Sequence, residues 1–281
     1  MDGKNLWGVI RKMNFLITGY RGFIGSNLLK QLPGDVIKIE KDFLDNDNWK
    51  DLLHSYVKLV DIIFHIGAIS DTSLQDSTEM LKYNYLFSKQ LFDLAQKYKK
   101  KVIYSSSAAC YGDGDGIPNN IYGWSKLLAE DYGIAVCDDF VSLRYFNVYG
   151  PGESNKGKMS SIAFQSWKLS SMKLFPKKPR RDFIYVEDVV SANIHAIDSP
   201  KGIYEVGSGE ARTFEDVLDN MGIKYTYHSE DKIPSWYQFY TKSDKSKWLP
   251  GWKPKYKLED GIKKYLDCIR IILQKGCKLN V

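Results

Sequence analysis

A glycine-rich turn near the start of the chain, T-G-Y-R-G-F-I-G at residues 18–25, most constrains what the chain can fold into. The turn follows a short β-branched run at 14–18 and opens a segment with helical periodicity, which predicts a strand–turn–helix unit. Gly19, Gly22 and Gly25 permit a tight turn and a close approach of the backbone, and the N–H groups at a helix N-terminus suit a pyrophosphate. A glycine triplet alone is weak evidence, but this position after a strand predicts dinucleotide binding.

The following segments alternate between strand-like and helix-like patterns. Further strands are expected at 36–40, 61–66, 101–107 and 139–146, and helices at 49–56, at about 76–100 and around Tyr122. Strands that alternate with helices indicate a parallel sheet with right-handed crossovers, so the predicted class is α/β, a doubly wound parallel sheet of the Rossmann type.

The alternation loosens past about residue 148, where a smaller α/β C-terminal lobe is expected to cover the ligand crevice at the carboxyl ends of the strands. The expected divisions are a flexible leader, a dinucleotide-binding domain made of two segments, and a substrate-binding lobe made of two more. Their boundaries are 1–12 for the leader, 13–148 plus roughly 182–207 for the first domain, and 149–181 plus 208–281 for the lobe.

Composition excludes several other classes of protein. The four cysteines share no C-x-x-C spacing and the four histidines form no H-E-x-x-H pair, so neither a metal site nor a disulfide framework is predicted, and a reducing cytoplasm fits. No apolar run has the length of a membrane span, so no membrane partner is expected. The net charge of +6 includes one dense basic run, K-K-P-R-R at 177–181. This run could bind nucleic acid or be a solvated loop, but its shortness favours a clamp for a small anionic ligand.

Tyr122 and Lys126 stand four positions apart in the stretch N-I-Y-G-W-S-K-L-L-A-E, and residues with that spacing share one face of a helix. A second pair with the same spacing, Tyr85 and Lys89, lies in the middle of a predicted helix. The spacing alone does not separate an acid–base pair from chance neighbours, so the surrounding motifs must decide.

Six motifs in order carry a resemblance that covers residues 14 to 265. They are T-G-x-x-G-F-I-G, F-H-I-G-A, Y-S-S-S-A-A-C-Y-G, Y-G-W-S-K, R-Y-F-N-V-Y-G-P and R-D-F-I-Y-V-E-D-V. Through these six motifs the chain resembles the extended short-chain dehydrogenases/reductases that act on nucleotide sugars. The stretch 147–165, together with 70–91 and 235–244, is most similar to the ADP-L-glycero-D-manno-heptose 6-epimerase family. The resemblance implies an epimerase that oxidises a carbinol carbon transiently, with a UDP- or GDP-sugar 4-epimerase or 4-dehydrogenase as the alternative. A non-catalytic NAD(P)-sensing protein is a weaker alternative.

The resemblance implies roles for four catalytic residues. Tyr122 would be the acid–base group, its pKa lowered by the Lys126 ammonium and the cofactor, and Ser107 would hydrogen-bond the substrate hydroxyl. Lys156 would be a second acid–base group for the ketone after it turns in the pocket. Acidic residues follow the catalytic hydroxyl in related 4,6-dehydratases, but alanines stand there in this chain, which disfavours elimination.

The resemblance also implies a nucleotide-diphosphate sugar as the partner and two sets of binding residues. Because family members often form oligomers, it implies a homo-oligomer as well. The cofactor set is Gly19, Arg21, Gly22, Phe23, Ile24, Gly25, Glu40, Lys41, Ile66, Gly67, Ala68, Tyr83 and Lys126. The substrate set is Asn147, Lys158, Gln165, Phe175, Arg181 and Tyr237, with Arg181 expected to pair with the diphosphate. Three residues of the two sets depart from the family pattern. In the substrate set, Gln165 replaces a usual histidine and Lys158 replaces a small polar residue; in the cofactor set, Tyr83 replaces an asparagine.

Conflicting signals bear on which tightly bound nicotinamide cofactor is used. Glu40 ends the second predicted strand, where a carboxylate would accept hydrogen bonds from ribose hydroxyls and disfavour a 2′-phosphate. Arg21, Lys38 and Lys41 are all able to pair with that phosphate. The sequence leans slightly to NADP and leaves NAD open.

Overall fold

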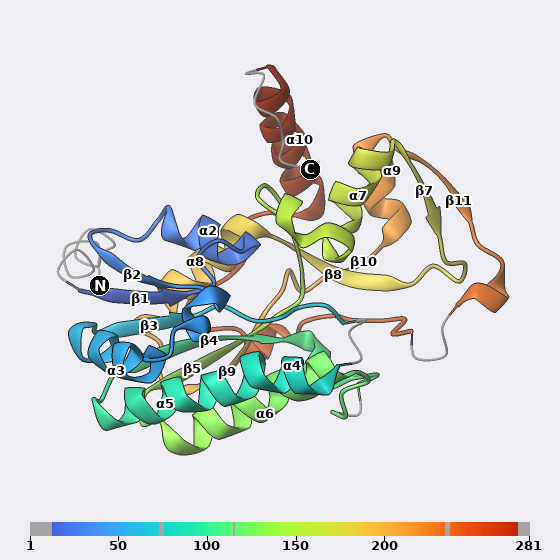
Figure 1. Cartoon of the computed structure of the whole chain (residues 1–281). Helices are drawn as coiled ribbons and strands as arrows, with labels where there is room; N and C mark the ends of the chain where they lie inside the picture. The colour runs from blue at the N-terminus through green and yellow to red at the C-terminus, as the bar shows by residue number, and fades with distance from the viewer. Residues whose placement is uncertain (1–12, 73–75, 115, 234–236, 275–281) are drawn as a thin grey trace.

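A six-stranded parallel sheet forms the centre of the molecule in the computed structural model, which describes residues 13–72, 76–114, 116–233 and 237–274. The strand order is β2-β1-β3-β4-β5-β9, and every neighbouring pair is parallel (Figure 1). The chain runs outward from β1 to β2 and then returns to β3 on the other side, so the strand order reverses between β1 and β3. The predicted doubly wound α/β class is confirmed, and the reversal marks the expected ligand crevice. The proposed leader, 1–12, lies outside the described residues.

Five strands of this sheet lie within two residues of the predicted positions at each end, whereas β9 was not predicted as a strand. Their bounds are β1 Phe15–Thr18, β2 Val36–Ile39, β3 Ile62–His65, β4 Lys101–Ser107, β5 Phe140–Tyr145 and β9 Gly202–Val206. The helices that connect or cover them are α2 Phe23–Leu29, α3 Trp49–Leu59, α4 Ser77–Leu81, α5 Phe87–Lys97, α6 Ile121–Val136 and α8 Val186–His195. The single helix expected at about 76–100 contains a π-helical turn, Lys82–Leu86, between α4 and α5.

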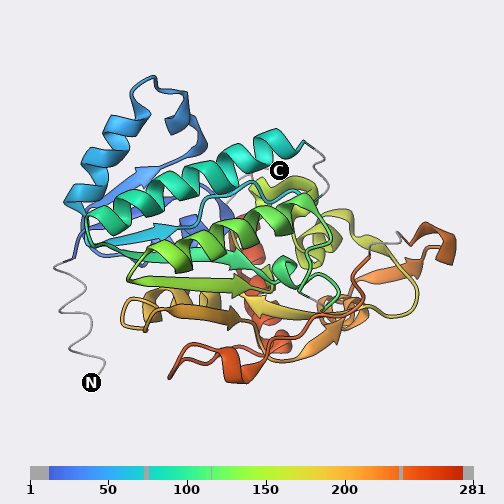
Figure 2. The same ribbon diagram turned by 90° about the horizontal axis from the view of Figure 1, so that it is seen from below.

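Alternating side chains of the sheet build two separate apolar layers. Phe15 and Ile17 of β1 belong to the cluster that packs against α2 and α8, whereas Leu16 between them belongs to the cluster under α3, α5 and α6. Figures 1 and 2 show these helices on opposite faces of the sheet, with α5 and α6 side by side. Strands buried on both faces have near-continuous apolar runs, which is why these segments could be recognised in the sequence.

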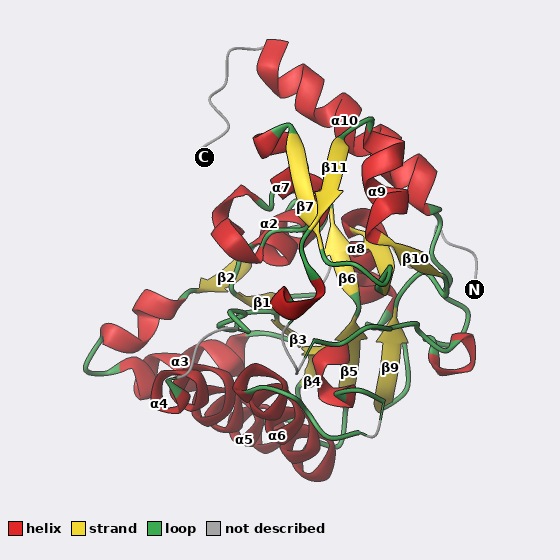
Figure 3. Cartoon of the chain, turned by 90° about the vertical axis from the view of Figure 1, so that its right-hand side faces the viewer, coloured by secondary structure: helices red, strands yellow, loops and turns green. Residues whose placement is uncertain are grey.

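Two smaller sheets lie beyond the carboxyl ends of the large sheet (Figure 3). One has the order β10-β8-β6 and the other pairs β11 with β7. The strands are β6 Asn147–Tyr149, β7 Ser171–Leu174, β8 Arg180–Tyr185, β10 Ala211–Thr213 and β11 Lys224–Tyr227. The accompanying helices are α7 Ile162–Leu169, α9 Phe214–Met221 and α10 Leu258–Gln274. The predicted domain boundaries stay a prediction, although β9 returns to the large sheet within the expected segment.

Helix α10 packs through its apolar residues into a third core cluster with Tyr149, Phe164 and Phe183. Its far end projects from the body of the molecule (Figure 1). Within the described part of the chain, none of the helices combines the length and the apolarity that crossing a membrane requires.

Candidate active site

A cavity of about 1210 Å³ lies where the large sheet meets the two smaller ones, and it is lined by residues from Thr18 to Tyr237. It brings together twenty of the twenty-two residues that the sequence analysis singles out. These are Gly19, Gly22, Phe23, Ile24, Gly25, Glu40, Lys41, Ile66, Gly67, Ala68, Tyr83, Ser107, Tyr122, Lys126, Asn147, Lys156, Lys158, Gln165, Phe175 and Tyr237. Arg21 and Arg181 are outside the lining. The cavity is large enough for a dinucleotide together with part of a second ligand.

The glycine loop packs closely against the loop that follows β3. Gly19 has a φ of +68°, and a Cβ built on it would lie 2.5 Å from the Gly67 Cα. A Cβ at Gly25 would lie 2.1 Å from the Gly19 carbonyl oxygen, so a side chain at either position would displace backbone. Gly22 is the N-cap of α2 and brings no side chain over the helix N-terminus. This bare, close-packed turn fits a pyrophosphate, as the sequence analysis predicts.

At the ends of β1 and β2 the charged residues are paired with one another. The Arg21 backbone N–H donates to Glu40 Oε1 at 2.5 Å, and the Arg21 guanidinium pairs with Asp42 at 3.1 Å. Lys41 pairs with Glu79, and its Nζ lies 4.4 Å from the centre of the Tyr83 ring. Two of the three cations on which the lean to NADP rests therefore already have acidic partners, so the structure does not support that lean.

Ser107 ends β4, and Tyr122 and Lys126 project from α6, which is packed tightly against the turn after that strand. A Cβ on Gly123 would lie 2.6 Å from the Ala109 carbonyl oxygen, so glycine is what lets the helix approach. Asn120 caps α6 by accepting from the Gly123 N–H at 2.8 Å. A side-chain hydrogen bond links Ser107 with Tyr122, as the sequence analysis expects of a shared site.

The expected acidic phenol is not produced by the protein's own side chains. Burial raises the pKa of Tyr122 to about 12, and the hydrogen bond with Ser107 only partly opposes this effect. Burial also lowers the pKa of Lys126 to about 8. The Lys126 Nζ donates to the Ser105 carbonyl at 2.5 Å and lies 4.7 Å from the centre of the Tyr104 ring. Lys126 is not among the causes of the shift in the Tyr122 pKa, so the prediction that the Lys126 ammonium and the nicotinamide ring together acidify Tyr122 stays a prediction.

Lys156 and Lys158 reach the cavity from a 3₁₀ turn, Ser154–Met159, that follows β6. Burial lowers the pKa of Lys156, and its Nζ lies 5.6 Å from the centre of the Phe23 ring on α2. Lys158 forms an ion pair at 3.2 Å with Asp71, which belongs to the loop after β3 and also lines the cavity. Gln165 lines the cavity, but its amide nitrogen donates to the carbonyls of Lys158 (3.1 Å) and Ser160 (2.7 Å) and so supports this turn.

Aromatic side chains form the far end of the cavity. The rings of Phe175 and Tyr237 meet edge to face, with centres 4.9 Å apart. The Arg181 guanidinium lies 5.3 Å from the centre of the Tyr237 ring, is only 8% exposed, and donates to the carbonyls of Arg180 and Gln238. Arg181 therefore supports the aromatic wall, and its pairing with a diphosphate stays a prediction.

The second tyrosine–lysine pair is outside the cavity. Lys89 pairs with Asp93 at 2.8 Å, and both side chains are about two-fifths exposed. Tyr85 packs edge to face against Tyr132, with ring centres 6.4 Å apart. Tyr85 and Lys89 therefore make structural contacts away from the cavity.

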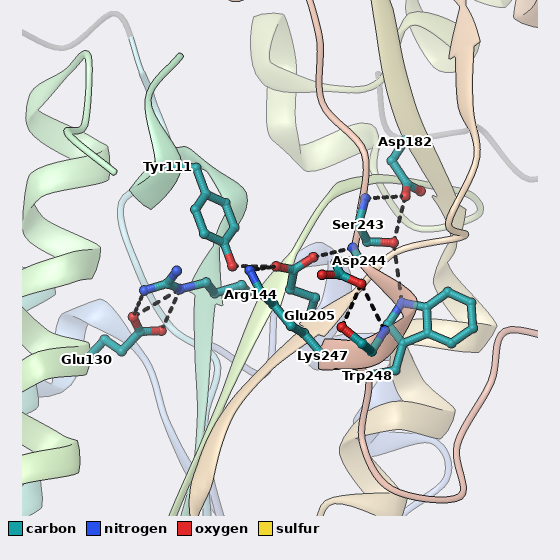
Figure 4. A network of polar contacts seen from close by, with 10 residues as sticks. Tyr111, Glu130, Arg144, Asp182, Glu205, Ser243, Asp244, Lys247 and Trp248 are labelled. Carbon is teal, nitrogen blue, oxygen red and sulfur yellow. Dashed lines mark hydrogen bonds and ion pairs between the residues drawn. The ribbon is translucent and has the colours of Figure 1, made fainter. Parts of the chain in front are cut away.

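A polar network includes Tyr111, the last residue of the 3₁₀ turn Ala108–Tyr111 that follows Ser107, and the sequence analysis missed it (Figure 4). Glu130 on α6 is fully buried and accepts two hydrogen bonds from the Arg144 Nε, at 3.0 and 3.2 Å. The Arg144 guanidinium lies 4.5 Å from the centre of the Tyr111 ring, and the Tyr111 hydroxyl donates to Glu205 at 2.6 Å. The Asp244 N–H donates to the other oxygen of Glu205 at 2.6 Å.

These residues come from the turn after β4, α6, β5, β9 and the segment before α10, so the network joins five parts of the chain. The available signal was Glu130 itself, an acidic residue one turn beyond Lys126 on the same helix face, where a charge needs a buried partner.

Comparison with known proteins identifies the family. The model of the NAD dependent epimerase/dehydratase family matches residues 15–207, and the chain belongs to this family. An ADP-L-glycero-D-manno-heptose-6-epimerase from Brachyspira hyodysenteriae is 32% identical over 310 residues, which cover 90% of this chain and 97% of the relative. The crystal structure of the Helicobacter pylori ADP-L-glycero-D-manno-heptose-6-epimerase superposes with a TM-score of 0.82 at 30% identity, covering 93% of this chain and 97% of that one. A Thermotoga maritima UDP-glucose 4-epimerase with UDP-glucose has the same fold (TM-score 0.78, 24% identity, 93% and 100% covered).

Proposed function

We propose that this chain is a nucleotide-sugar epimerase that inverts a carbinol carbon by transient oxidation, with ADP-D-glycero-D-manno-heptose as the substrate. The observation that carries the proposal is the presence, in one cavity, of two half-buried groups able to transfer protons, from separate elements: Tyr122 on α6 and Lys156 on the turn after β6. The choice of sugar is supported by the names of relatives whose alignments cover 90% or more of this chain.

Inversion by oxidation and reduction explains why two such groups are useful. A nicotinamide ring bound in the cleft supplies the hydride acceptor and donor. Tyr122 takes the proton of the substrate hydroxyl, and Ser107, already hydrogen-bonded to Tyr122, holds the oxygen that develops charge. After the ketone turns over, its oxygen faces the other wall, and Lys156 donates the proton there. Burial lowers the pKa of Lys156, which makes its ammonium a better acid than an exposed one.

Lys126 has a positioning role in this scheme. Its ammonium donates to the Ser105 carbonyl beside the catalytic turn, and a pKa of about 8 leaves it mostly charged at neutral pH. A fixed positive charge close to the phenol and the nicotinamide ribose favours the phenolate once the ring of the cofactor adds to it.

For the cofactor, we propose NAD. The Glu40 carboxylate follows β2, where it would accept hydrogen bonds from the adenosine ribose, and Arg21 and Lys41 are already paired with Asp42 and Glu79. The description of the family also names NAD. Asn147, Lys158, Phe175 and Tyr237 are the proposed contacts for the nucleotide sugar, with Gln165 and Arg181 supporting them. The expected cytoplasmic location and homo-oligomeric assembly stay predictions.

Two measurements test this proposal. Purified protein is incubated with ADP-D-glycero-D-manno-heptose, and the product is separated by chromatography and assigned by NMR; inversion without net reduction of NAD is expected. A parallel panel of UDP- and GDP-sugars identifies a 4-epimerase, and accumulation of NADH during turnover identifies a dehydrogenase. Titration with NAD and NADP then compares their dissociation constants. Tighter binding of NADP would overturn the cofactor assignment while leaving the reaction class intact.

A further inference from the structure

Glu153, which the proposed mechanism does not use, is a fully buried acid three residues before Lys156. It is the N-cap of the 3₁₀ turn that carries Lys156, and its backbone carbonyl accepts from the Lys156 N–H at 3.0 Å. Burying a carboxylate is unfavourable unless hydrogen bonds and charge compensate for lost water, so this position needs a reason.

Four donors converge on the Glu153 carboxylate. The backbone N–H groups of Gly150 (3.2 Å) and Ser161 (2.5 Å) donate to it, and so do the hydroxyls of Ser161 (2.8 Å) and Tyr265 (3.1 Å). Burial raises the pKa of Glu153, and the backbone N–H groups, which can only donate, oppose that rise because they favour the ionised, acceptor-only form of the side chain. The bonds close the loop from Gly150 to Ser161 and fasten it to α10.

The same loop is held against α2, which lies beneath Lys156. The Asn27 amide donates to the Pro151 carbonyl at 2.9 Å. A Cβ on Gly152 would lie 3.0 Å from the Asn27 amide nitrogen, so this end of the loop is packed closely against α2. The Lys156 ammonium then lies over the Phe23 ring, at the edge of the cavity.

We propose that Glu153 is a positioning residue whose buried carboxylate holds the Lys156 ammonium at the cavity wall and keeps it charged. Burial lowers the pKa of Lys156, and the charge of Glu153 opposes that lowering. Tyr265 of α10 is the titratable group that faces Glu153 from outside its own turn, while α2 contributes the uncharged Phe23 and Asn27. The inference rests on the proposed function, because it explains how the second acid–base group is maintained.

Two substitutions separate charge from placement. Glu153→Gln keeps the length of the side chain and removes its charge, whereas Glu153→Asp keeps the charge and shortens the reach. The matched control is Asp188→Asn, which alters another buried acid with bonds to the backbone, accepting from Lys255 and Tyr256 (2.8 and 3.0 Å) near the start of α10. Thermal unfolding of each variant shows which of them are folded.

The first readout does not depend on turnover. Competitive acetylation with acetic anhydride across a pH series, quantified by mass spectrometry of the Lys156 peptide, reports the pKa of that amine. We expect Glu153→Gln to lower it by about one unit, and Glu153→Asp and Asp188→Asn to lower it by much less. An unchanged value in a folded Glu153→Gln protein would overturn the inference.

The second readout is epimerisation, measured beside the reduction of bound cofactor in a single turnover. Glu153→Gln is expected to slow product formation about tenfold and shift its pH optimum down, with the first oxidation unaffected. If the pKa of Lys156 moves and product formation does not, the electrostatic part of the inference holds and the proposed role of Lys156 fails. If Lys156→Ala stops product formation while Glu153→Gln alters neither quantity, the proposed function stands and this inference falls.

Discussion

Tyr122 and Lys156 line one cavity, but the chain holds them by different means. Tyr122 is the second residue of a 16-residue helix that packs on the central sheet, and its neighbours Ser107 and Lys126 are fixed by regular main-chain structure. Lys156 is in a six-residue 3₁₀ turn that contains a glycine with a φ of +52°. Side-chain bonds to Glu153 and Gln165 hold that turn in place.

The difference shows how one cavity can combine a rigid and an adaptable wall. On the α6 side, burial shifts the pKa of Tyr122 up to about 12 and that of Lys126 down to about 8, and dense packing leaves little freedom. On the turn side, the burial of Lys156 is offset by one acid, and the neighbouring Lys158 is about two-thirds exposed. A ketone intermediate that must rotate to present its other face needs one wall whose catalytic groups stay fixed and one wall that can adjust to the rotated ketone.

The largest expected effect tests the rigid wall. Tyr122→Phe should reduce epimerisation about a thousandfold or more, because the phenyl ring keeps the packing and loses the group that transfers the proton. Cofactor binding should be unchanged, as measured by titration with NAD. Lys156→Ala, in contrast, should still allow the first oxidation in a single turnover. If the two variants stop at the same step, the division of labour between the walls is wrong.

The second effect concerns the network behind the rigid wall. Arg144→Met leaves the fully buried Glu130 without its guanidinium and should lower the free energy of unfolding by about 3–5 kcal/mol, measured in urea. The double variant Arg144→Met/Glu130→Leu should recover most of the loss, because an apolar pair carries no desolvation cost. A single variant as stable as the native protein would show that the pair contributes little to holding α6.

The sequence predicts the residues and elements of the rigid wall better than those of the adaptable wall. The β-strands and the α6 pair could be predicted because doubly buried strands read as apolar runs and because i and i+4 residues share a helix face. Glu153 and Arg144 could not, because their partners, Tyr265 and Glu130, are brought to them only by tertiary packing. The rise that burial gives the pKa of Tyr122 in the absence of cofactor could not be predicted either, since the depth of burial is not visible in a motif.

The π-helical turn at Lys82–Leu86 shows the same limit on a smaller scale. The sequence predicted one uninterrupted helix there, and periodicity does not reveal an inserted residue. The turn contains Asn84, whose amide nitrogen donates to the Ile69 carbonyl and to Ser125, at 2.9 and 3.0 Å. Asn84 thereby connects the loop after β3 with α6, and so it stabilises the rigid wall from a second direction.

A third prediction uses pH on a buried group of the rigid wall. Burial lowers the pKa of His65 to about 3, with a smaller contribution from the charge of Lys126. Between the ordinary histidine pKa of about 6.5 in the unfolded chain and about 3, the folded protein therefore binds fewer protons than the unfolded chain. The neutral His65 thus contributes to the free energy of unfolding above pH 6.5, and this contribution is lost as the pH falls towards 3. From neutral pH to about pH 5 the loss should be about 2 kcal/mol. His65→Gln should flatten this part of the urea-unfolding profile, whereas an unchanged slope would assign the acid sensitivity to other groups.

The smallest effect is expected on the adaptable wall, at the ion pair between Lys158 and Asp71. The Lys158 side chain is 68% exposed and that of Asp71 31%, so water and salt screen the attraction. Lys158→Ala should change the free energy of unfolding by less than about 1 kcal/mol, and added salt should reduce even that difference. Any functional effect should then appear in KM for the nucleotide sugar, with kcat nearly unchanged, because the side chain borders the cavity mouth without taking part in proton transfer. A loss of stability as large as that of Arg144→Met would mean that this wall is as rigid as the other, and the ketone would have to rotate in a pocket that does not adapt to it.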